Sequence, residues 1–180
     1  MKQIRIIVML LCGALLLGLC ACGGGKKKNT ELIKSFLTEY YTLNKDDRFR
    51  SFSDAVATDS SDAVKPFKEY YGYAGDLTEK FLDYMLSSRL STKYDRLAQK
   101  KGLTVTVESV ELKETGDGEY EYTLKLTMND GSSSKEYEAL GKVRLSDDDE
   151  PKIKELTVNS IRDGDGNSRE IGRASCRERV

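Results

Sequence analysis

An alternation of polar and apolar residues from Glu119 to Met128, EYEYTLKLTM, constrains the fold of this chain more than any other feature. A period of two over this length predicts a β-strand with one buried face and one solvated face. The predicted buried face consists of Tyr120, Tyr122, Leu124, Leu126 and Met128. Such a strand belongs to a sheet whose apolar face another layer must cover.

Three further segments carry the same signature. Their predicted inward residues are Leu103, Val105 and Val107, then Tyr137, Ala139, Gly141, Val143 and Leu145, and lastly Ile153, Leu156 and Val158. The irregular spacing of the last set predicts a β-bulge. Turn sequences separate the segments, namely TGDG at 115–118, NDGSSS at 129–134 and DDDEP at 147–151. The four segments together predict an antiparallel meander.

The residues before Gly102 show the period of an α-helix instead. Asn29 or Thr30 can cap a first helix, whose apolar residues recur on one face: Leu32, Ile33, Phe36, Leu37, Tyr40 and Tyr41. A shorter pattern covers 49–56, and Pro66 can open a further helical turn.

Another helix is predicted after Asp76 and Glu79, which have the form of a capping box. A last helix carries Tyr94, Leu97 and Ala98 and ends at Gly102. The predicted fold class is α+β. We expect N-terminal helices packed on a curved four-stranded antiparallel sheet, in a single domain over residues 30–161.

The amino terminus has the pattern of an export signal. Lys2 and Arg5 precede 14 largely apolar residues at 6–19, a stretch too short for a comfortable transmembrane helix. The sequence LCAC at 19–22 follows, and it resembles the lipobox of bacterial lipoproteins, with a small residue directly before Cys22. The alternative is an uncleaved membrane anchor, because the apolar run can be extended as far as Cys22.

The lipobox resemblance implies that residues 1–21 are a cleaved signal peptide and that Cys22 is the lipidation site. Its thiol would receive a diacylglyceryl group and its freed amine an acyl chain such as palmitate, and two or more chains anchor a protein stably. The expected location is the extracytoplasmic face of the cell membrane. Residues 22–29 have the composition of a flexible tether, primarily a solubilising spacer, whose three lysines can also lie against anionic headgroups.

Cysteine and histidine usage excludes several kinds of chemistry. The four cysteines are Cys12, Cys20, Cys22 and Cys176, so none lies in the predicted domain, and the chain has no histidine. Disulfides, thiol catalysis, cysteine-zinc sites and Ser-His machinery are therefore excluded from that domain. We expect no cofactor, no metal and no catalytic residue. Without residues 1–22 and 170–180 the chain has 29 − 5 = 24 basic and 30 − 2 = 28 acidic residues, and this net charge of −4 argues against nucleic acid as a partner.

The order of helices followed by long strands resembles the nuclear-transport-factor-2-like, or cystatin-like, superfamily. The resemblance is carried by IKSFLTEYYTLNKDDRFRSF, by KYDRLAQKKGLTVTVESV and by KVRLSDDDEPKIKELTV, and it covers about residues 30–160. Small lipoproteins and accessory domains of envelope machines with this plan imply a binding or assembly role without catalysis, with a protein partner in the envelope. The alternative is a small-molecule pocket enzyme of the ketosteroid-isomerase or polyketide-cyclase type.

The helical half concentrates the aromatic residues, including seven of the ten tyrosines: Tyr40, Tyr41, Tyr70, Tyr71, Tyr73, Tyr84 and Tyr94. One interpretation is an aromatic pocket in which a tyrosine and a buried carboxylate move protons. The favoured interpretation is a disulfide-free core built from aromatic rings, with hydroxyl groups at its edge.

The end of the chain holds two weak patterns. Asp163, Asp165 and Asn167 have the spacing of a calcium loop, but Ser168 stands where the loop needs glycine, so we expect 162–169 to be a polar linker. The sequence IGRASCRERV at 171–180 can be back-translated into the DNA of a common short-read sequencing adapter. Residues 170–180 are therefore expected to be an adapter-derived artefact.

Overall fold

The structure is a computed structural model that describes residues 24–44, 47–58 and 62–164. By its contacts the chain divides into two compact units, Met1–Leu32 and Ile33–Val180. The second unit contains the sheet and all helices that begin after Ile33. Helix α2 (Gly24–Tyr41) starts in the first unit and continues into the second.

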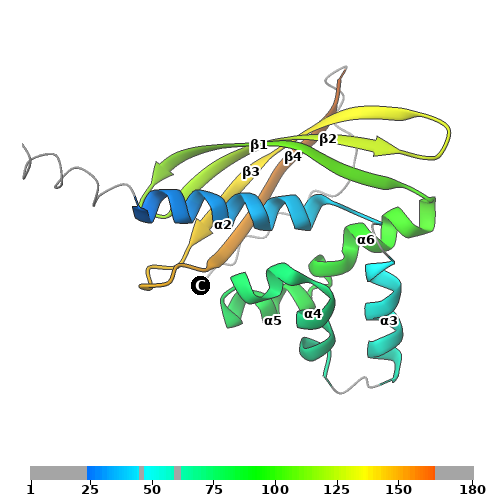
Figure 1. The fold of residues 1–180 in the computed structure, drawn as a ribbon, viewed down its shortest axis with the longest axis horizontal. Coiled ribbons are helices and arrows are strands. Elements are labelled where there is room, and N and C mark those ends of the chain that lie inside the picture. Colours follow the sequence, from blue (N-terminus) through cyan, green and yellow to red (C-terminus); the bar gives the residue numbers. More distant parts are fainter. Residues whose placement is uncertain (1–23, 45–46, 59–61, 165–180) are drawn as a thin grey trace, which may run out of the picture. The chain divides into compact units, whose positions relative to one another are not determined.

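The described residues form helices first and strands second, which confirms the α+β class (Figure 1). After α2 come α3 (Arg48–Thr58), α4 (Val64–Tyr70), the 3-10 helix η1 (Gly72–Asp76), α5 (Glu79–Ser87) and α6 (Leu90–Lys101). The strands are β1 (Thr104–Gly116), β2 (Glu119–Asn129), β3 (Ser134–Leu145) and β4 (Ile153–Asp163).

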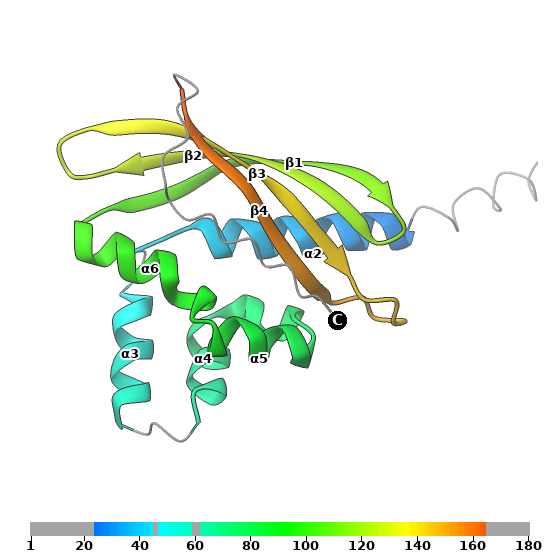
Figure 2. The same cartoon turned by 180° about the vertical axis from the view of Figure 1, so that it is seen from behind.

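The four strands form an antiparallel meander in the order β1-β2-β3-β4, as predicted. The alternation in β2 is confirmed, because Tyr120, Tyr122, Leu124 and Leu126 are at most 2% exposed. Met128, expected to be buried with them, is half-buried at the end of the strand. The part of α2 from Ile33 onward lies on this apolar face, in front of the sheet in Figure 1 and behind it in Figure 2.

Backbone bridges tie the helical segment to both edges of the sheet. Leu43, just after α2, exchanges backbone hydrogen bonds of 3.0 and 3.3 Å with Val105 in β1. Leu77, just after η1, forms a parallel bridge with Ile153 in β4, and the Thr78 N–H donates to the Ile153 carbonyl at 3.0 Å. The helices between these two points are thus attached to the first and the last strand.

Bulges keep the apolar residues on one face. The register of β4 against β3 shifts twice, which confirms the predicted bulge in this strand. The register of β1 against β2 shifts between Val107 and Ser109, so that Val110 and Leu112 face the same side as Val107. A bulge also bends its strand and increases the local twist.

Helix α2 begins earlier than expected. Residues 24–29, predicted to be part of a flexible tether, are helical, and neither Asn29 nor Thr30 is a cap. Thr30 lies inside the helix, where its hydroxyl donates to the carbonyls of Lys26 at 3.1 Å and Lys27 at 2.9 Å. The physical reason is that lysine is a good helix former and that extending an existing helix needs no new nucleus.

The cap of α5 also differs from the prediction. Thr78, and not Asp76, is the N-cap residue, and its hydroxyl accepts from the Phe81 N–H at 3.3 Å. Asp76 instead ends η1. A cap needs extended backbone directly before the helix, and Thr78 has this geometry at φ −65° and ψ 150°.

The ends of two further elements test the sequence predictions. Gly102, with φ 62°, ends α6 as expected in the left-handed region that glycine favours. Strand β4 continues to Asp163 and pairs Arg162 with Glu138, so the polar linker expected at 162–169 does not begin at Arg162. Asp165 and Asn167, the other members of the calcium pattern, lie outside the described residues, as does the adapter-like tail.

Candidate functional site

Aromatic rings fill the space between the helices. Phe67 and Tyr71 stack with ring centroids 4.5 Å apart, and Tyr73 meets both of them edge-on at 5.7 and 5.8 Å. Phe36 in α2 packs against Tyr73 at 5.4 Å. Tyr71 and Tyr73 are at most 2% exposed. The interpretation as core is confirmed for five of the seven tyrosines, whereas Tyr70 and Tyr84 are half-buried. Several hydroxyl groups lie inside that core and not at its edge.

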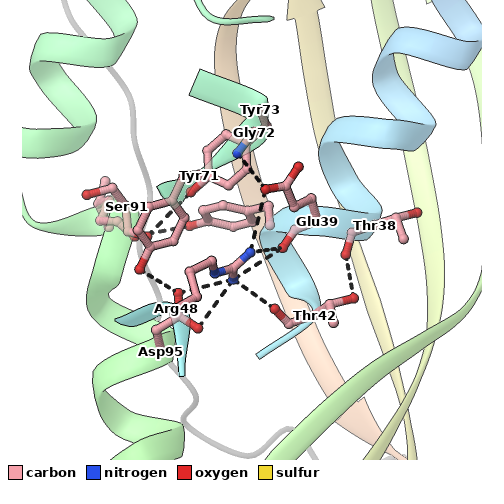
Figure 3. A network of polar contacts seen from close by, with 11 residues as sticks. Thr38, Glu39, Thr42, Arg48, Tyr71, Gly72, Tyr73, Ser91 and Asp95 are labelled. Atoms are coloured by element: carbon pink, nitrogen blue, oxygen red, sulfur yellow. Dashed lines mark hydrogen bonds and ion pairs between the residues drawn. The ribbon is translucent and has the colours of Figure 1, made fainter. Parts of the chain in front are cut away.

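A buried ion pair organises the polar groups of this core (Figure 3). Arg48, at the start of α3, places Nη2 3.2 Å from Oδ2 of Asp95 in α6, and the two side chains are 14% and 4% exposed. The guanidinium carbon of Arg48 also lies 4.5 Å from the centre of the Tyr71 ring. An ion pair this well shielded from water needs further hydrogen bonds to be stable.

Arg48 supplies such bonds to the end of α2. Its Nη2 donates to the Thr42 carbonyl at 2.9 Å, and its Nη1 donates to the Glu39 carbonyl at 3.4 Å. The last carbonyls of a helix have no partner within the helix and carry a partial negative charge. Arg48 therefore satisfies the end of α2 with a positive charge while it holds Asp95.

Glu39 extends the network to η1. Its Oε1 accepts the Gly72 N–H at 2.7 Å and lies 3.7 Å from Nη1 of Arg48. Glu39 is in α2, Arg48 in α3, Gly72 in η1 and Asp95 in α6, so three charged side chains and one backbone N–H join four helices (Figure 3).

Tyr71 completes the shell around Asp95. Its hydroxyl donates to Oδ2 of Asp95 at 3.0 Å. Burial, followed by the negative charge of Asp95, raises the pKa of Tyr71 well above its ordinary value. Burial also raises the pKa of Tyr73, whose hydroxyl donates to the Ser91 carbonyl at 3.5 Å. Both phenols therefore stay protonated at neutral pH and act as hydrogen-bond donors.

Chemically, this arrangement favours a structural role for Asp95. Its two carboxylate oxygens accept from Tyr71 and from Arg48, so both already have hydrogen-bond partners within the protein. A general base must instead be free to take a proton from a substrate within hydrogen-bond reach. The network is better suited to fixing the positions of helices than to proton transfer.

A second polar contact joins α2 to the sheet. The hydroxyls of Tyr41 and Tyr122 lie 2.8 Å apart, and Tyr122 also donates to the Thr157 carbonyl at 3.3 Å. The Tyr122 hydroxyl crosses β3 at Gly141, where a Cβ atom would overlap both this hydroxyl and the Thr157 carbonyl. The missing side chain at Gly141 is what lets the phenol reach β4.

The solvated face of the sheet carries paired charges. Lys142 lies 3.2 Å from Glu119 and 3.5 Å from Glu121, and Arg144 lies 3.3 Å from Glu155. A hydrogen bond from Lys142 and its positive charge lower the pKa of Glu119. The hydrogen bond to Glu119 and the negative charge of Glu119 raise the pKa of Lys142. Opposite charges facing each other across strands are typical of a surface in contact with water.

Three further features are the predicted lipidation site, metal ligands and membrane-spanning helices, of which the first cannot be placed in the fold. Cys22, the predicted lipidation site, lies outside the described residues. Within residues 24–44, 47–58 and 62–164 no group of three or more acidic, cysteine or histidine side chains is placed to hold a metal ion. No helix in that part of the chain has the length and apolar content needed to span a membrane.

Sequence reasoning missed Arg48 and Asp95. A signal for Asp95 was present, because Ser91, Tyr94, Asp95 and Ala98 share one helical face, and all four are buried. An aspartate within a buried stripe needs a partner. No pattern around Arg48 identified it as that partner.

Comparisons with protein families, with curated proteins and with solved structures find no match to this chain.

Proposed function

We propose that this protein is a lipid-anchored binding or assembly module on the extracytoplasmic face of the cell membrane, without catalytic activity. In this role Cys22 carries the lipid, and the α+β domain binds a protein partner of the cell envelope. Nucleic acid is not proposed as a partner, because residues 23–169 carry a formal net charge of 24 − 28 = −4.

The observation that carries the non-enzymatic role is the state of Asp95. It is the one buried carboxylate among the described residues, and both of its oxygens accept hydrogen bonds from Arg48 or Tyr71. A carboxylate whose oxygens are already used in this way is poorly placed to take a proton from a substrate, which supports the non-catalytic role. The anchor is supported by the lipobox pattern at 19–22.

We further propose that the domain has the cone-like fold of the nuclear-transport-factor-2-like superfamily. A long first helix on the apolar face, a four-stranded meander and bulges in β1 and β4 all support this assignment. The fold alone does not specify a function, because one fold hosts many activities.

The hydrogen bond from Tyr71 to Asp95 favours one alternative, a small-molecule enzyme of the ketosteroid-isomerase or polyketide-cyclase type. In such an enzyme, binding of a planar ketone would require the Tyr71 hydroxyl to leave Asp95. The difference spectrum of the tyrosines on titration with a steroid ketone tests this. A saturable change that disappears in Tyr71→Phe would favour the enzyme over the module.

The anchor is tested by expressing the full chain in a bacterium and labelling it with an alkyne analogue of palmitate. We expect the wild-type protein to incorporate label and to enter the detergent phase of a Triton X-114 separation. Cys22→Ala should abolish both properties and leave an uncleaved precursor. Cys20→Ala is the matched control, because Cys20 follows the bulky Leu19 and should not be the acylated residue. If Cys20→Ala loses the label and Cys22→Ala keeps it, the assignment of Cys22 is wrong.

A further inference from the structure

Three consecutive lysines surround the start of α2. Lys26, Lys27 and Lys28 are exposed, and we call them the lysine ring. Successive residues of an α-helix are rotated by about 100° and rise 1.5 Å, so these side chains leave the axis in three directions within about 3 Å of height. The lysine ring is therefore suited to a flat charged layer that meets the helix at its end.

The positive charges of the lysine ring have the same sign as the dipole at this end of α2. The first turn of α2 contains no acidic residue. Cations near the amino end of a helix oppose its dipole, and three of them lie here. Anionic groups around the same turn would stabilise this end of the helix, because they pair with the lysines and are attracted by the positive end of the dipole.

The lysine ring lies close in sequence to the predicted lipid. Helix α2 begins two residues after Cys22, and Lys26 is four residues after it. Four residues span at most about 14 Å even when fully extended. The surface potential of an anionic leaflet decays over a Debye length of about 10 Å. A chain anchored at Cys22 thus keeps the lysine ring within or near the headgroup layer.

From these observations we propose that the lysine ring binds the anionic phospholipid headgroups around the anchor and thereby stabilises the first turns of α2. This inference rests on the proposed lipid anchor and adds the lipid class that the anchored end of the domain recognises. Three lysines at such a surface favour contact on the order of 100-fold over a neutral surface.

The test uses the processed, lipidated protein reconstituted into two kinds of vesicle. One contains phosphatidylcholine alone, and the other contains equal parts of phosphatidylcholine and phosphatidylglycerol. Backbone hydrogen exchange of the peptides covering residues 24–32 is measured in both. We expect several-fold slower exchange in the anionic vesicles and loss of this difference at about 1 M KCl, where the Debye length is ~3 Å.

Two charge-matched variants complete the experiment. Replacing Lys26, Lys27 and Lys28 by glutamine should remove the lipid dependence of exchange. Replacing Lys65, Lys68 and Lys135, three exposed lysines elsewhere, by glutamine should leave the lipid dependence of exchange unchanged.

Equal exchange in the two kinds of vesicle, with the wild-type protein retained by both, would overturn the lysine-ring inference and leave the anchor standing. Protein retained by neither kind would overturn the anchor, and the inference with it. A lipid dependence that survives in the Lys26, Lys27 and Lys28 variant would also refute the role of the lysine ring.

Discussion

Removing the charge of Arg48 is the most direct test of the polar network. Arg48→Met keeps an unbranched apolar stem but removes the guanidinium, so Asp95, 3% exposed as a residue, loses the cation 3.2 Å away. Leaving one partner of a buried ion pair uncompensated costs about 3–5 kcal/mol. For a domain of this size that loss corresponds to a fall in Tm of about 10–15 °C.

A double-mutant cycle separates the ion pair from the other contacts of Arg48. Arg48→Met combined with Asp95→Leu removes both charges and should be more stable than Arg48→Met alone, since no buried charge then remains unpaired. A residual cost of about 1–2 kcal/mol is expected, because the Thr42 and Glu39 carbonyls still lose their donor.

The assay is urea unfolding followed by far-UV circular dichroism, with the free energy of unfolding taken at constant m-value. Arg50→Met is the matched control. The pair of Arg50 with Asp47 has a similar distance of 3.4 Å, but its side chains are 62% and 64% exposed. Its loss should cost at most about 1 kcal/mol. If Arg48→Met costs no more than Arg50→Met, or if the two changes at Arg48 and Asp95 are additive, the reasoning about the buried pair is refuted.

Two further predictions concern the core. Gly141→Ala should destabilise the protein by about 1–3 kcal/mol in urea unfolding, because its Cβ would overlap the Tyr122 hydroxyl. Gly75→Ala is the control and should change stability little, because no atom lies within 4 Å of its Cβ. Equal effects at the two glycines would contradict the crossing of β3 by Tyr122. Burial raises the pKa of Tyr71 and Tyr73 above the ordinary value of 10.0, so the unfolded state releases protons that the folded state keeps. The stability that these two phenols contribute should be fully present below about pH 10 and should be lost as the pH rises above this value. A urea midpoint that stays constant from about pH 9 to pH 11 would count against this.

Local patterns in the sequence were enough to predict the sheet. In β2 and β3 the period of two agrees with the buried residues, and turn residues mark all three hairpins. The helical period likewise identified the buried residues of α2, from Ile33 to Tyr41. These predictions succeed because burial of one face and turn geometry depend mainly on residues that are close in sequence.

The ends of elements were less predictable. The start of α2 at Gly24 and the cap of α5 at Thr78 each differ from the sequence-based expectation by a few residues. Several positions near a helix end can serve as a cap, and extension of a helix by one turn changes its free energy only slightly. Composition alone, such as glycines followed by lysines, does not decide between a tether and a helix.

Only the tertiary structure revealed which polar groups meet. Arg48 and Asp95 are 47 residues apart in sequence, and Tyr41 and Tyr122 are 81 apart. Periodicity reports which face of an element is buried, but it carries no information on which buried group of another element lies opposite. The sequence by itself determined the α+β fold class, whereas lipidation at Cys22 stays a prediction. The partner of the buried aspartate, and with it the structural role of the aromatic core, was decided by packing between segments distant in the chain.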